Sequence, residues 1–223
     1  IVSFLSSFLL AIAFANLLPK EVYGTYRYIL SIFSLLSIPT LAGINTALVR
    51  SVAQGYDSSI LPALKTKIKW GLLGGLSSLI LAGYYYYNHN LTLTVCFAIA
   101  GIFIPFMDSF LVFDSFLLGK KLFNKYSQYN TVITFFSAVV MVSTVFFTKN
   151  VYLIILSYFF VYTLLRLFAL LVTIKKIDWN KKEDLEMIKY GKHLSAIDIL
   201  SILADQLDKI LIFHFLGASQ LAI

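Results

Sequence analysis

Residues 91–118 read LTLTVCFAIAGIFIPFMDSFLVFDSFLL, and this stretch decides the class of fold. It contains no lysine, arginine, glutamate or histidine, and its only carboxylates are Asp108 and Asp114. An α-helix rises about 1.5 Å per residue, so roughly 20 apolar residues cross a bilayer core about 30 Å thick. We therefore expect residues 91–118 to span a membrane as a helix.

The composition of the whole chain also indicates a lipid environment. Of the 223 residues, 59% are hydrophobic and 13% are charged, and the mean hydropathy is +0.84. Soluble domains carry about 25% charged residues, so the composition excludes a soluble globular protein. The single cysteine, Cys96, excludes an internal disulfide framework and a cysteine-based zinc site. The net charge of +7 indicates a membrane surface rather than nucleic acid, because the basic residues lie in loops between apolar blocks.

Apolar blocks recur on both sides of residues 91–118. We expect an all-α polytopic membrane protein with a six-helix transmembrane lobe at 1–174 and a cytoplasmic linker at 175–193. Residues 194–223 would then begin a second, truncated lobe. The chain has no initiator methionine and no signal-peptide pattern, so we expect a fragment of a two-lobe transporter with parallel repeats. The blocks are 1–18, 28–49, 70–87, 91–118, 129–147, 151–174 and 194–216.

The positions of lysine and arginine predict the orientation of these helices. Basic residues mark cytoplasmic connections. With the second connection inside, 13 basic residues lie inside and only Lys20, Arg27 and Lys149 lie outside. The N-terminus is therefore predicted to be cytoplasmic. The inside set is Arg50, Lys65, Lys67, Lys69, Lys120, Lys121, Lys125, Lys175, Lys176, Lys181, Lys182, Lys189 and Lys192.

Two of the inner connections have features of their own. In residues 58–70, apolar residues recur at near-helical spacing between lysines, which predicts a short helix lying at the lipid headgroups. Residues 175–193 mix acidic and basic side chains, which is typical of a linker. A solvated loop is the alternative for both.

Seven charged residues (Asp, Lys or Arg) fall inside the predicted spans. A charge near the bilayer centre costs about 2.5–3.5 kcal/mol, so it persists only beside a partner or a hydrated cavity. On a helix, the four such residues of block 194–216 share one face of roughly 100°. We expect this face to line a hydrated passage that also conducts a coupling ion. The seven residues are Asp108, Asp114, Arg166, Asp198, Asp205, Asp208 and Lys209.

Simpler interpretations of these charges stay open. Asp205 and Lys209 have the i,i+4 spacing of a self-neutralising pair, and Arg166 has the length to extend to the cytoplasmic interface. Asp114 and Asp198 lie near inner ends of their blocks. Pro105 and Pro39 predict kinks that shape the cavity, with ordinary helix bending as the alternative, preferred for Pro39.

No catalytic or metal motif is found. The three histidines are scattered, and no phosphate-binding loop, dinucleotide-binding glycine motif or nucleophile elbow is present. We therefore expect no enzyme activity, no metal site and no cofactor beyond a coupling proton or sodium ion.

Three motifs carry a resemblance to a known family. Residues 18–26 (LPKEVYGTY), 43–53 (GINTALVRSVA) and 208–217 (DKILIFHFLG) resemble segments of the polysaccharide-export, O-antigen (Wzx-type) flippases. These belong to the multidrug/oligosaccharidyl-lipid/polysaccharide exporters. The motif glycines are Gly24, Gly43 and Gly217. A weak match of residues 14–21 with 212–219 also fits two repeats, whereas Gly191-Lys192-His193 replaces the family's Gly-x-Pro.

The resemblance implies a flippase in the inner membrane of a bacterium or archaeon. It would move polyprenyl-pyrophosphate-linked oligosaccharide to the outer leaflet by alternating access, beside other polysaccharide-assembly proteins. Arg50, Lys65, Lys67 and Lys69 would attract the anionic head group, although their part in topology explains them equally well. A cation-coupled drug efflux pump, a non-transporting assembly protein and a membrane-embedded glycan-processing enzyme are the alternatives.

Overall fold

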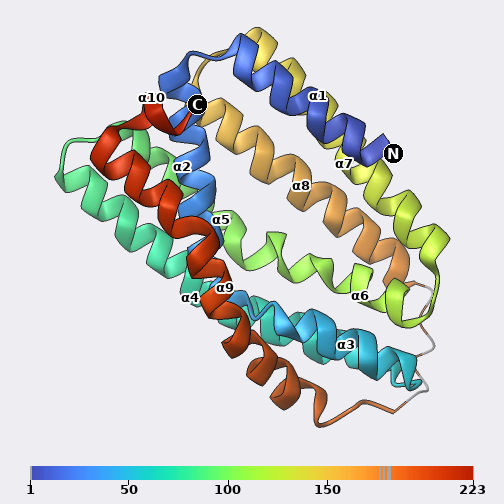
Figure 1. Ribbon diagram of the computed structural model, residues 1–223. Helices are drawn as coiled ribbons and strands as arrows, with labels where there is room; N and C mark the ends of the chain where they lie inside the picture. Colours follow the sequence, from blue (N-terminus) through green and yellow to red (C-terminus); the bar gives the residue numbers. More distant parts are fainter. Residues whose placement is uncertain (1, 176, 178, 180–181, 223) are drawn as a thin grey trace.

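The computed structural model describes residues 2–175, 177, 179 and 182–222, and within these ranges the chain is helical with no strand (Figure 1). Short 3₁₀ turns (η) separate several of the α-helices. The elements are α1 (Val2–Leu17), α2 (Lys20–Leu36), η1 (Ile38–Thr40), α3 (Gly43–Ala53), η2 (Asp57–Ser59), α4 (Ile60–Tyr87), α5 (Leu91–Met107), η3 (Ser109–Leu111), α6 (Val112–Gly119), α7 (Phe123–Phe147), α8 (Val151–Ile174), α9 (Met187–Leu216) and α10 (Ala218–Leu221).

Several of these helices are long and apolar enough to cross a bilayer. Leu91–Gly119, Phe123–Phe147 and Val151–Ile174 each meet that requirement alone, and α2 with α3 meets it as a pair bent by 43°. The polytopic, all-α class predicted from the sequence is therefore confirmed. Helices α4 and α9, which contain two further predicted spans, do not meet it. Lysines occupy the first turns of α4 and tyrosines its last turn, and α9 carries the acids discussed above.

The predicted interfacial helix at residues 58–70 is wrong. Residues 60–87 form one continuous helix, α4, whose first turns pack inside the protein, with Ile60 and Ala63 fully buried. Pro62 does not interrupt it, because proline is tolerated in the first turn of a helix. The apolar face assigned to lipid headgroups is thus occupied by α3 and α6.

The inner connections predicted from the basic residues gather at one end of the bundle (Figure 1). Asp57 of η2 forms an ion pair with Lys120 at the end of α6. The Ser58 hydroxyl donates to the Trp179 carbonyl at 3.4 Å, and the Asp184 amide donates to Ser59 Oγ at 2.9 Å. Polar contacts therefore join three connections that are far apart in the sequence. Lys176, Asp178 and Lys181 of the predicted linker lie outside the described residues.

Helix α9 begins inside the predicted linker and crosses α3 closely. It starts at Met187 and continues through Gly191, seven residues before the boundary expected at 194. Gly43 faces Gly191 and Ser195 at the crossing, and the Gly43 amide donates to Ser195 Oγ at 3.0 Å. Small residues let two helix backbones approach in this way. The α3–α9 contact therefore places the first half of α9 against the N-terminal bundle.

Two clusters of buried apolar residues stabilise the bundle, one toward each end. Helix α5 contributes to the first cluster and α6 to the second, so the break between them at Asp108 falls between the clusters. The first cluster includes Ile29, Phe97, Ile104, Met141 and Phe159, and the second includes Ile44, Leu48, Ile60, Phe113 and Leu170.

Candidate functional site: a polar cavity at two helix breaks

Two helix breaks lie close to each other and supply the polar groups of the site. Pro39 lies in η1, where α2 and α3 meet at 43°, and Leu41 adopts a left-handed conformation with φ of 59°. Ordinary bending, the interpretation preferred for Pro39, is therefore wrong: the helix is interrupted. Pro105 precedes the second break, between α5 and α6. Proline removes a backbone donor from the helix ladder, which explains both positions.

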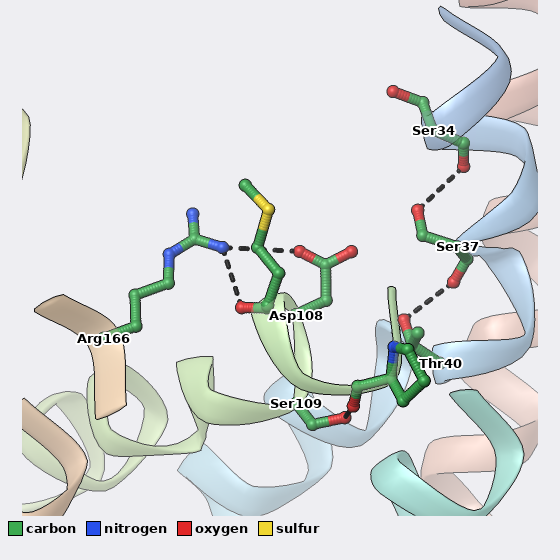
Figure 2. A network of polar contacts seen from close by, with 8 residues as sticks. Ser34, Ser37, Thr40, Asp108, Ser109 and Arg166 are labelled. Atoms are coloured by element: carbon green, nitrogen blue, oxygen red, sulfur yellow. Dashed lines mark hydrogen bonds and ion pairs between the residues drawn. The ribbon is translucent and has the colours of Figure 1, made fainter. Parts of the chain in front are cut away.

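Hydroxyl side chains donate hydrogen bonds to backbone carbonyls at these breaks (Figure 2). Ser37 donates to the Ser34 carbonyl at 2.9 Å, and Thr40 donates to the Ser37 carbonyl at 2.7 Å. Ser109 donates to the Pro105 carbonyl at 2.6 Å. Since unpaired backbone groups are costly in a membrane interior, these bonds help the helices to remain broken there.

An ion pair links the second break to α8. Figure 2 shows Arg166 reaching Asp108, with Nη1 to Oδ1 at 3.5 Å, and the same nitrogen donates to the Met107 carbonyl at 2.9 Å. The guanidinium also lies over the Tyr162 ring at 5.5 Å. Arg166 therefore points into the bundle toward Asp108, and its predicted alternative, an extension toward the cytoplasmic interface, is wrong.

Lys67 of α4 is the most unusual side chain at the site. It is fully buried, and its Nζ has no hydrogen-bond partner among the described residues. Lys67 and Asp108 line a cavity of about 170 Å³, to which Asn45 contributes a buried Oδ1 that also lacks a partner there. The other polar lining residues are Ser37, Thr40, Ser195 and Asp198.

Positive and negative side chains both lie around this cavity, but not all of them are paired. Asp108 is shared with Arg166, and Asp198 approaches from α9. A buried ammonium without hydrogen bonds is strongly disfavoured. The cavity therefore suits water or an anionic group that accepts hydrogen bonds from Lys67, and polar groups from four segments of the chain surround that position.

The four charged residues predicted to share one face of α9 have different surroundings in the structure. Asp198 borders the cavity, whereas Asp205 and Asp208 are exposed. Lys209 does not pair with Asp205 as the alternative proposed; its Nζ donates to Gln206 Oε1 at 3.2 Å. The Asp208 carboxylate accepts the Lys209 amide at 2.7 Å.

The remaining predicted residues lie at other places. Asp114 accepts a hydrogen bond from Asn130 Nδ2 at 2.8 Å, away from the cavity. Of the predicted head-group set, Lys65 and Lys69 are exposed, and Arg50 lies over the Tyr190 ring at 5.1 Å. Of the predicted head-group residues only Lys67 is buried inside the bundle, so the structure does not place it beside Lys65, Lys69 and Arg50 in one basic group.

The structure explains why glycine stands at each of the three motif positions. Gly24 lies against the Ala218 carbonyl of α10, where a side chain would collide, and Gly43 lies at the α3–α9 crossing. Gly217 ends α9 with φ of 90°, a conformation that favours glycine.

The sequence predicted neither Asn45 as a site residue nor the burial of Lys67. A signal for Lys67 was present, because small residues recur around it at helical spacing and form the buried face of α4: Ala63, Gly71, Gly74, Gly75 and Ser78. A lysine within such a stripe points toward the packed side of the helix.

The model of a family described as "Polysaccharide biosynthesis protein" matches residues 1–223. The chain belongs to this family. Comparisons with curated proteins and with solved structures found no match. Members of the polysaccharide biosynthesis family are generally transporters, which agrees with a membrane protein whose polar cavity lies among its helices. Among the described residues there is no cluster of three or more side chains suited to bind a metal ion.

Proposed function

We propose that the protein is a flippase that moves a polyprenyl-pyrophosphate-linked oligosaccharide from the cytoplasmic to the outer leaflet. Membership of the polysaccharide biosynthesis family and the apolar spans support a role in glycan export across a membrane. The observation that carries the proposal is the unpartnered, buried Lys67 in a polar cavity. The cytoplasmic membrane, with the N-terminus inside, is the proposed location.

The cavity suggests how an anionic head group is held. A phosphate oxygen beside Lys67 would supply the hydrogen bonds that its Nζ lacks, and charge-assisted bonds of this kind are the strong ones. Asn45 and Ser195 would contribute further polar contacts from α3 and α9. Arg166 holds Asp108, which limits the competition of that carboxylate for Lys67.

The helix breaks suggest how access alternates. Residues 37–42 and 108–111 interrupt two spans at the cavity, so small backbone rotations there would open it to one side or the other. Asp108 or Asp198 would bind a coupling proton or sodium ion in one state and release it in the other. Asp205, Asp208 and Lys209 would face the second half of the passage.

Glycan export in living cells tests the proposal. The full-length gene carrying Lys67→Met is returned to cells that lack it, and surface glycan is measured at matched protein level. We expect export to fall at least about tenfold, because one charge-assisted hydrogen bond contributes about 1.5–3 kcal/mol. Lys65→Met, two residues away and exposed, serves as the matched control and should export normally.

Three outcomes contradict the proposal. Full export by Lys67→Met would remove the cavity lysine from the mechanism. Normal surface glycan after loss of the gene, together with raised drug sensitivity, would indicate the efflux pump instead. Normal transport with failed assembly of partner proteins would indicate a structural subunit.

A further inference from the structure

A groove between α7 and α8 lies apart from the polar cavity. The two helices pack side by side (Figure 1), and a pocket of about 200 Å³ with an almost wholly apolar lining lies between them. A second pocket, also about 200 Å³, lies at the inner end of the helices and shares Tyr129 with the first. The first pocket includes Val132, Leu165, Phe168 and Val172, and the second includes Lys120, Lys125 and Thr173.

The apolar part of the groove opens to the surroundings of the protein. Val132 is 49% exposed and Phe168 is 67% exposed, one on each side of it. Both helices qualify as membrane spans, so the groove lies where acyl chains contact the protein. An open apolar groove at this depth fits a single lipid chain along its length.

The inner end of the groove is basic. Lys125 lines the second pocket, and Lys121 is four residues earlier; both are exposed, and no ion pair among the described residues involves either. Lys120 is paired with Asp57, so it adds less free charge. None of the described residues lining the two pockets is acidic.

The apolar residues between these lysines suit the membrane interface. Leu122 is 37% exposed and Phe123 is 59% exposed, while Tyr126 and Tyr129 are half-buried just beyond them. Exposed apolar residues beside lysines insert at the boundary between headgroups and acyl chains, and tyrosines are enriched at that level. The groove therefore passes from acyl-chain depth to headgroup depth where the positive charge begins.

We propose that this groove is a binding site for an anionic phospholipid of the surrounding bilayer. One acyl chain lies between α7 and α8, and the phosphate headgroup lies against Lys125 and Lys121. Basic pockets between membrane helices bind anionic headgroups in this manner. The site requires no transport step and is independent of the flippase proposal.

Lipid retention by the purified full-length protein tests the site. Protein in detergent is mixed with equal phosphatidylglycerol and phosphatidylcholine, and bound lipid is counted by native mass spectrometry. Wild type is expected to retain phosphatidylglycerol preferentially. The double variant Lys121→Gln/Lys125→Gln should bind it about 30-fold more weakly at low salt, since each basic residue contributes about 1 kcal/mol and about 1.4 kcal/mol is tenfold.

Matched variants separate the headgroup from the acyl chain. Lys149→Gln removes an exposed lysine at the other end of α7 and should retain the preference. Val132→Trp fills the groove and should lower retention of both lipids. Val139→Trp, on the same helix face and 46% exposed but outside the pocket, should not.

Several results would overturn the proposal. Equal retention of the two phospholipids by wild type would show that the basic end selects nothing. Equal losses in the variants and their controls would show that the groove is not the site. Displacement of phosphatidylglycerol by an equimolar amount of undecaprenyl phosphate would assign the groove to the carrier lipid. Glycan export is not measured, so failure here leaves the flippase proposal intact.

Discussion

The α3–α9 crossing predicts that Gly43→Ala destabilises the protein. A Cβ built on Gly43 would lie 2.6 Å from the Gly191 carbonyl oxygen and 2.7 Å from Leu194 Cβ. These neighbours include the backbone of α9, which cannot rotate away as a flexible side chain does. The helices must therefore separate, and the bond from the Gly43 amide to Ser195 Oγ lengthens or breaks.

The expected loss of stability follows from three contributions. Overpacking of one carbon costs about 1–3 kcal/mol, and a lost buried hydrogen bond costs about 1 kcal/mol. Alanine recovers up to about 1 kcal/mol through its higher helix propensity. The net loss is about 2 kcal/mol, which corresponds to a fall in apparent melting temperature of about 4–8 °C for a chain of this size.

Thermal unfolding of the purified protein in detergent measures this fall, with Gly83→Ala as the control. Gly83 also lies in a helix, but apart from its chain neighbours and its own helix backbone no atom lies within 4 Å of the position of an added Cβ. The control should unfold at the wild-type temperature or slightly above it. If both variants behave alike, or if Gly43→Ala is neutral, α9 does not cross α3 at this point and the cavity wall is wrongly assigned.

Two further predictions concern the ion pairs. Asp108→Asn and Arg166→Gln should each lower glycan export, because each single change leaves an unpaired charge. The double variant should lose less export than the sum of the two single losses, and additive losses would argue against the ion pair. Lys120→Gln removes the ion pair between Lys120 and the buried Asp57 carboxylate. The inner connections should therefore loosen by about 2 kcal/mol, measured as faster proteolytic cleavage than in Lys149→Gln.

The sequence was most informative where local patterns decide structure. The apolar runs at 91–118, 129–147 and 151–174 predicted membrane spans, and the structure has apolar helices of sufficient length at Leu91–Gly119, Phe123–Phe147 and Val151–Ile174, because the length of a span follows from bilayer thickness. Counting basic residues grouped the connections that the structure brings together through Asp57 and Lys120. Pro105 indicated where the fourth predicted span is interrupted.

The features that sequence reasoning missed depend on tertiary contacts. Arg166 and Asp108 belong to different helices, and no local pattern connects them. The continuity of α4 depends on α3 and α6 covering Ile60 and Ala63, which a hydrophobic pattern cannot distinguish from lipid contact. The early start of α9 depends on Gly191 fitting against Ile44.

The order in which the chain is synthesised gives the cavity a consequence for membrane insertion. Lys67 lies early in the sequence, whereas Ser195 and Asp198, which close one wall around it, follow about 130 residues later. At about 5–20 residues per second, a ribosome needs on the order of ten seconds to make the intervening chain. During that interval the ammonium group must stay hydrated through a half-built bundle, so α4 is expected to insert shallowly at first and to settle only when α9 arrives.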